Sequence, residues 1–155
     1  ELPPRVKELG RLLHAANIPV VGYVQSAIGG NNDTEVQREL TGDNPISSEE
    51  YLRQGDYPRR VVVAVRLHAA LMALKAGHYV IHLAYERKGF SAFADVGLPE
   101  WVHNVNTFTP TEVRAQVEAL LHDESVRAEY RRRLAEQREA LEQKYARMSE
   151  ILREQ

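Results

Sequence analysis

The stretch VVVAVRLHAALMALKAG, residues Val61–Gly77, contains the change of pattern that decides the fold. Its first five residues are apolar and rich in valine, which is typical of a buried β-strand. From Leu67 onward, apolar side chains recur at three- and four-residue steps, and this spacing predicts an amphipathic helix. Arg66 and His68 lie at the join. The sequence therefore predicts a core strand that becomes a core helix at a fixed positive charge and a titratable ring.

The same alternation of strand and helix extends along the chain. Strands separated by helices of this length indicate βαβ units, so we expect an α/β fold: a Rossmann-like parallel sheet with helices on both faces. We predict one domain over residues 1–155. The expected helices are 6–17, one from Thr34, a short one begun at Ser47 or Ser48, 67–76, a piece around 90–96, one from Thr109 or Thr111 through Leu121, and a long one capped by Asp123; the expected strands are 18–25, 60–65, 78–84 and 102–105.

Composition excludes several classes of protein. The chain has no cysteine, so it has neither a disulfide framework nor thiolate chemistry. A net charge of −2 gives no general attraction to nucleic acid, and no apolar run approaches the ~20 residues of a membrane span. We expect the protein to be cytoplasmic, with peripheral binding at the inner face of the membrane as the alternative.

Arg66 and His68 are the strongest candidates for a functional site. Ligands of open α/β sheets bind beyond the carboxyl ends of the strands, where the following helix offers free N–H groups to an anion. If the chain is still extended there, residues two apart leave on the same face. A guanidinium holds a carboxylate or phosphate in a fork of hydrogen bonds, and an imidazole transfers protons near neutral pH. The alternative is a solvated arginine and a structural histidine, which the position at this edge disfavours.

Other polar clusters have simpler interpretations. Gly29–Asp33 follows a strand and precedes a helix, but a turn with an N-cap explains it. His78 and His82 share a strand face without a further ligand at metal spacing, so we expect no metal. Arg131–Arg133 is flanked by glutamates at helix-pairing distances, which indicates a solvated face.

The region Val61–Leu98 also resembles the C-terminal half of the polysaccharide pyruvyl transferase family. That family shows a strand, R-L-H-A, a helix ending A-x-x-A-G, a second strand, Y-x-x-K, and a phenylalanine-containing helix ending G-L. The matching residues here are Arg66-Leu67-His68-Ala69, Ala73–Gly77, Tyr85-Glu86-Arg87-Lys88 and Phe93–Leu98. The chain departs from the family at Ala64-Val65, where a serine commonly precedes the arginine motif, and at His78, where a proline is common.

The resemblance implies a transferase that moves a pyruvyl group from phosphoenolpyruvate to two hydroxyls of a glycan acceptor, forming a cyclic ketal on a cell-surface polysaccharide or its precursor. It implies half of a GT-B-like architecture, with Arg66, Leu67 and His68 in the phosphoenolpyruvate site. Lys88 would add positive charge, whereas Tyr85 would shape the pocket or, as we expect, pack. The scheme needs no metal and no cofactor beyond phosphoenolpyruvate as donor substrate.

The segment 123–155 predicts one very long terminal helix. Its apolar stripe comprises Val126, Tyr130, Leu134, Leu141, Tyr145, Met148 and Leu152. At ~1.5 Å per residue the helix would reach about 45 Å, longer than a domain of this size is wide. Its overhang needs either a missing N-terminal domain or a second copy of the chain. We expect these residues to be the C-terminal part of a longer protein and to be inactive alone.

Two rival functions remain open. One is a nucleotide-sugar-dependent GT-B glycosyltransferase domain, and the absence of a ribose-binding carboxylate pair after a glycine-rich turn counts against it. The other is a non-catalytic α/β interaction module whose terminal helix is the binding surface.

Overall fold

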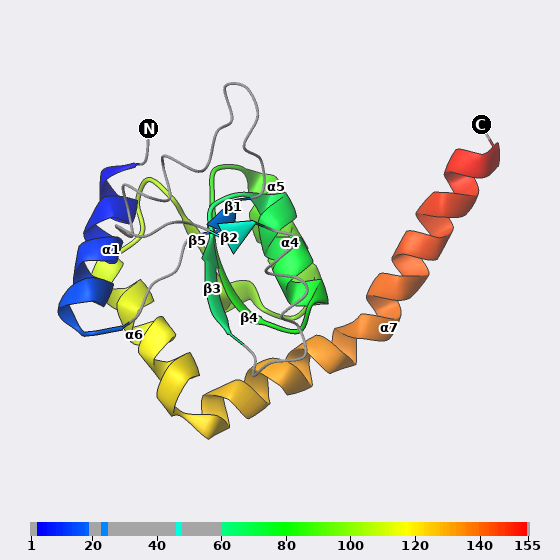
Figure 1. Cartoon of the computed structure of the whole chain (residues 1–155). Helices are drawn as coiled ribbons and strands as arrows, with labels where there is room; N and C mark the ends of the chain where they lie inside the picture. The colour runs from blue at the N-terminus through cyan, green and yellow to red at the C-terminus, as the bar shows by residue number, and fades with distance from the viewer. Residues whose placement is uncertain (1–2, 19–22, 25–45, 48–59, 155) are drawn as a thin grey trace.

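The computed structural model describes residues 3–18, 23–24, 46–47 and 60–154 (Figure 1). Its centre is a three-stranded parallel sheet in the order β3-β4-β5. The strands are β3 (Val61–Ala64), β4 (Tyr79–Ala84) and β5 (Val102–Asn104). All six residues of β4 are buried, as expected for a strand covered on both faces. The α/β prediction is confirmed.

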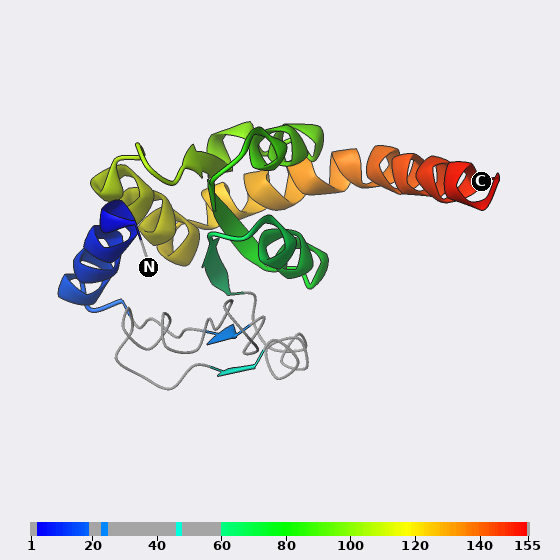
Figure 2. The same ribbon diagram turned by 90° about the horizontal axis from the view of Figure 1, so that it is seen from above.

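Helices cover both faces of this sheet. Figure 2 shows α4 and α5 on one face and α1 and α6 on the other. Two successive right-handed crossovers that move in the same direction along a sheet place their helices on the same side, which accounts for α4 and α5. The helices are α1 (Pro4–Ala15), α4 (Leu67–Lys75), α5 (Arg87–Asp95), the short 3₁₀ helix η3 (Pro99–Trp101), α6 (Pro110–His122) and α7 (Glu124–Glu154).

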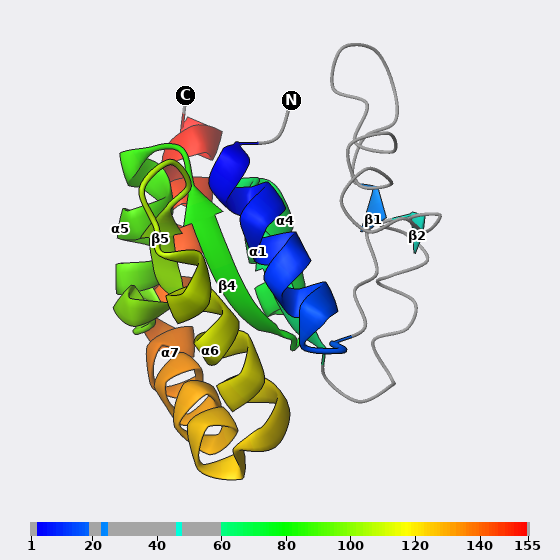
Figure 3. The same cartoon turned by 90° about the vertical axis from the view of Figure 1, so that its left-hand side faces the viewer.

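Some predicted elements differ from the observed ones. Helix α5 begins at Arg87 rather than near Phe90. Gly89 lies in its first turn, where a glycine destabilises a helix less than it does in the helix interior, so the helix can begin before it. Ile46–Ser47 forms strand β2, parallel to β1 (Tyr23–Val24), where a helix was expected to start (Figure 3). The predicted turn at 29–33 and the helix from Thr34 lie outside the described residues.

One tyrosine attaches helix α7 to the sheet. Strand β5 begins at Val102, which pairs with His82 of β4. The N–H and carbonyl of Val80, two residues earlier in β4, point to the same side but have no β5 residue beside them. The Tyr130 hydroxyl fills this place: it donates to the Val80 carbonyl and accepts from the Val80 N–H, both at 2.8 Å. Its ring makes edge-to-face contacts with Tyr79 and Trp101. Tyr130 therefore supplies the hydrogen bonds that a strand neighbour would have made.

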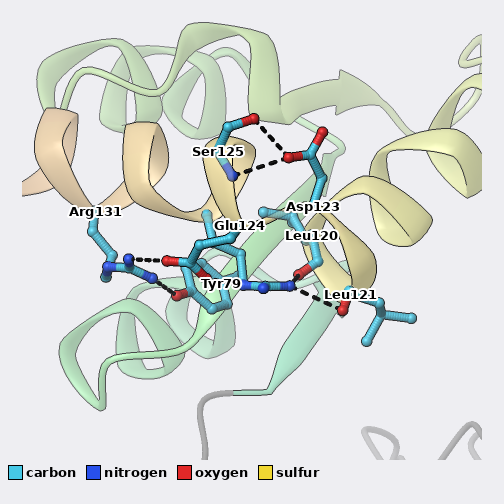
Figure 4. A network of polar contacts seen from close by, with 8 residues as sticks. Tyr79, Leu120, Leu121, Asp123, Glu124, Ser125 and Arg131 are labelled. Carbon is cyan, nitrogen blue, oxygen red and sulfur yellow. Dashed lines mark hydrogen bonds and ion pairs between the residues drawn. The ribbon is translucent and has the colours of Figure 1, made fainter.

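The start of α7 is fixed by polar contacts (Figure 4). Asp123 accepts hydrogen bonds from the Ser125 N–H (2.9 Å) and hydroxyl (2.6 Å), which confirms it as the predicted cap. Arg131 binds both the Tyr79 hydroxyl and Glu124. These contacts hold the first turns of α7 against the domain.

The rest of α7 follows the sequence-based expectation in most respects. Val126 and Leu134 of its apolar stripe pack against the core as partly buried side chains. Arg132 pairs with Glu129 and Glu136 on an exposed face, as predicted. Arg131 and Arg133 are half-buried and bind Tyr79 and Glu100, so the prediction of a solvated face is wrong for these two residues. Figure 1 shows the helix continuing well past the sheet and its covering helices. No helix in the described part of the chain is both long enough and apolar enough to cross a membrane.

We predict that Tyr130→Phe lowers the free energy of unfolding by about 2–4 kcal/mol, because it leaves the buried N–H and carbonyl of Val80 unpaired. Urea unfolding monitored by circular dichroism measures the change. The control is Tyr85→Phe, because the Tyr85 side chain is exposed; it should shift stability by less than about 0.5 kcal/mol. Equal stabilities for the two variants would show that Tyr130 acts through its ring alone.

Candidate functional site

The first part of the candidate site follows β3. Arg66 is the N-cap residue of α4, with extended backbone (φ −92°, ψ 133°), and His68 lies in the first helical turn. Both residues are exposed, and Leu67 between them is half-buried. Because the helix begins at Leu67, the chain is no longer extended at His68, and the condition under which both side chains would leave on one face is not met. The placement at the carboxyl end of the strand is as predicted.

The second part follows β4, the neighbouring strand. Lys88 is exposed in the first turn of α5, so the structure brings it to the same edge as Arg66. Tyr85 is 56% exposed, so the expectation that it packs is wrong. Its ring is available to a ligand at this edge. Phe90, 37% exposed on α5, is a second accessible aromatic ring near the turn.

Charge at these two helix starts opposes the usual preference. Acidic residues stabilise the first turn of a helix and cations destabilise it, by about 0.3–1 kcal/mol each. Helix α6 has Glu112 in its first turn and α7 has Glu124, whereas α1, which begins with Pro4, has neither an acidic residue nor a side-chain cap. The first turns of α4 and α5 have no acidic residue, and neither helix has a side-chain cap. They carry His68, Arg87 and Lys88 instead, and Glu86 at the N-cap position of α5 makes no capping hydrogen bond.

The turn after β5 adds polar groups that the sequence reasoning missed. Asn104, at the end of β5, pairs with Ala84 at the end of β4. Its side-chain oxygen accepts the Asn106 N–H at 2.8 Å, which forms a compact turn. Asn104, Asn106 and Thr107 are exposed. The signal that would have found them is their position directly after the third parallel strand.

His82 is the second feature that the sequence reasoning missed, because it was weighed only as a metal ligand. It is 2% exposed, and its Nδ1 lies 2.8 Å from the Ala64 carbonyl oxygen. Because a carbonyl only accepts, Nδ1 carries the proton. Burial lowers the pKa of His82 below its usual value, and the hydrogen bond to Ala64 opposes this only in part. The ring is therefore neutral at pH 7.

His78 has a separate backbone partner. Its Nδ1 accepts the Arg60 N–H at 3.0 Å, next to the point where Tyr79 N–H bonds the Arg60 carbonyl. The two histidines are thus bonded to the two ends of β3, His78 at its start and His82 at its end. The described residues contain no group of three side chains suited to a metal ion.

Comparisons of the chain with protein-family models, with curated proteins and with solved structures found no match. The site is therefore interpreted from its own geometry and from the motifs in the sequence.

The lowered pKa of His82 predicts a pH-dependent stability. The contribution of His82 to the free energy of unfolding is fully present above the pKa of the unfolded chain, near 6.5. It decreases as the pH falls toward the lower pKa of the folded protein, because the histidine of the unfolded chain then binds a proton and the buried ring does not. Urea unfolding of the wild type and of His82→Asn, which has no titrating ring, should show the wild type losing more stability between about pH 7.5 and pH 5.5. Parallel curves would mean that His82 titrates normally in the folded protein.

Proposed function

We propose that this chain carries the phosphoenolpyruvate site of a pyruvyl transferase that acts on a glycan. The proposed site is the edge formed by the turns after β3 and β4, with Arg66 and Lys88 binding the anion and His68 transferring a proton. Leu67, half-buried between Arg66 and His68, belongs to the same site, and Tyr85 contributes an exposed ring. The ordered motif set of Val61–Leu98 supports the choice of family.

The observation that carries the proposal is the charge at the two helix starts. Both α4 and α5 begin, at one edge of the sheet, without an acidic residue in the first turn and without a side-chain cap. Unpaired helix N–H groups and nearby cations attract an anion together. This arrangement weakens the helices unless an anion binds there, which is the pattern expected of a phosphate or carboxylate site.

The chemistry requires these residue types. Phosphoenolpyruvate gains a proton at its methylene carbon, which makes C2 electrophilic; a sugar hydroxyl adds to C2 and loses its proton. The C2–O bond to phosphate then breaks, and the second hydroxyl adds and loses its proton, giving the ketal and inorganic phosphate. Arg66 and Lys88 would stabilise the carboxylate and the departing phosphate. His68 would supply the first proton or accept one from a hydroxyl.

We predict that Arg66→Lys weakens phosphoenolpyruvate binding by about 1.5–3 kcal/mol, because a point charge does not reproduce the guanidinium fork. Isothermal titration calorimetry with the intact enzyme measures the affinity. The matched control is Arg138→Lys, the same substitution at an exposed arginine of α7, and it should leave the affinity unchanged. Unchanged affinity in both variants would assign Arg66 a structural role.

We also predict that, in the intact enzyme, His68→Ala lowers turnover by roughly 10²–10⁴-fold, because general acid–base catalysis contributes that much. Phosphate release from phosphoenolpyruvate with galactosyl, mannosyl and N-acetylated acceptors measures turnover. The melting temperature should stay near that of the wild type, since the side chain is exposed. A variant that unfolds would instead indicate a structural histidine.

The rival functions give different titration results. Binding of nucleotide-sugars in place of phosphoenolpyruvate would favour a glycosyltransferase domain. Binding of neither ligand would leave the interaction module, for which the long helix α7 is the surface.

A further inference from the structure

The interior of β4 contains one polar interruption. Its residues read Tyr-Val-Ile-His-Leu-Ala, and every one is buried. A strand covered on both faces is normally an apolar run, because a buried polar group loses its contact with water. A leucine at His82 would meet the need for packing alone. The imidazole therefore needs an explanation in what it bonds.

One side of the ring is bonded to β3. Ala64 lies opposite His82 in the sheet, and its carbonyl oxygen accepts the Nδ1–H at 2.8 Å. Ala64 is the last residue of β3, and Arg66 follows two residues later. The hydrogen bond therefore holds the end of the strand from which the Arg66 turn departs.

The other side of the ring is packed against helix α5. The ring stacks on Phe93, with centroids 5.5 Å apart and an interplanar angle of 27°. A Cβ added to Gly89 would lie 2.6 Å from His82 Nε2 and 2.8 Å from the Ala84 Cβ, closer than real Cβ atoms approach. Gly89 does not have a positive φ, so the glycine is required for space and not for backbone conformation. It lets the first turn of α5, next to Lys88, rest on the ring.

We infer that His82 is a positioning residue, whose ring sets the separation of the Arg66 and Lys88 turns by bridging the Ala64 carbonyl and Gly89. The identity of the ligand, phosphoenolpyruvate, rests on the proposed function. The coupling of the two turns by His82 does not depend on it. A directional hydrogen bond specifies one arrangement of two elements where apolar contact tolerates several.

The test compares His82→Leu with His82→Asn. Leucine fills space without a donor, whereas the asparagine amide places a donor near the position of Nδ1. The first readout is hydrogen exchange at the amides of Ala70 and Gly89, which bond the carbonyls of Arg66 and Glu86 in the two turns. The Asp123 amide, bonded to Ala119, is the reference at the far end of α6.

We expect His82→Leu to accelerate exchange at Ala70 and Gly89 by about three- to tenfold relative to Asp123, and to weaken phosphoenolpyruvate binding by a similar factor. His82→Asn should restore both toward wild type. A purely structural role would change the melting temperature, with exchange raised uniformly and no rescue specific to asparagine. That result would overturn the inference.

A second set of variants covers the case in which His82→Leu does not fold. Gly89→Ala should displace the first turn of α5 and weaken phosphoenolpyruvate binding. Gly89→Ala with His82→Asn removes the contact with Nε2 and should recover part of the loss, the remainder coming from Ala84 and from the asparagine atom near the place of His82 Cδ2. Ser91→Ala, at an exposed position of the same helix, is the control and should bind as wild type does. Additive effects of the Gly89 and His82 substitutions would contradict the bridge.

The two proposals fail differently. If the wild-type chain binds no phosphoenolpyruvate, the proposed function fails, and exchange at Ala70 and Gly89 still decides whether His82 couples the turns. If the wild type binds and His82→Leu behaves identically in both readouts, the positioning role fails and the proposed function stands.

Discussion

The paired hydrogen bonds between the Tyr130 hydroxyl and Val80 are the interaction on which the arrangement of this domain depends. Strand β5 has three residues and starts too late to cover the β5 side of β4 along its whole length. An open backbone position inside a core costs more than a missing apolar contact, because a buried N–H or carbonyl has no water to replace its partner. The hydroxyl of Tyr130, on helix α7, bonds both of these groups. The same side chain therefore allows β5 to be short and attaches α7 to the sheet.

The carboxyl edge of the sheet has the opposite character. The buried backbone groups of Val80 are both paired, whereas the first turns of α4 and α5 have no acidic residue and neither helix has a side-chain cap. Stability and ligand binding favour different residues at a helix start, and this edge has the residues that favour an anion. Helices α6 and α7 each have a glutamate in the first turn, so they have the residue that stabilises a helix start.

Much of this architecture was predictable because it depends on local patterns. The valine-rich run before Arg66, the helical spacing after it and the capping position of Asp123 each express a short-range preference. The position of Arg66 and His68 at the carboxyl end of β3 followed from the same reasoning.

The missed features depend on contacts between distant segments. The role of Tyr130 requires the register of β5 on β4, which no short stretch of sequence contains. His82 has the spacing from His78 that suggests a metal pair, and only the fold shows each ring bonded to a different end of β3. Tyr85 was expected to pack because aromatic residues usually do, but the chain turns out of the sheet at that residue.

Helix α7 has a mechanical consequence, because the contacts with the domain that the structure describes lie in its first half. From Leu134 to Glu154 it extends by about 30 Å at ~1.5 Å per residue. A rotation of about 5° at the attachment would therefore move its far end by about 3 Å, by the same helical rise. The helix is a lever: small reorientations of the domain surface around Tyr79 and Trp101 are enlarged at its tip, where a spectroscopic label would report them.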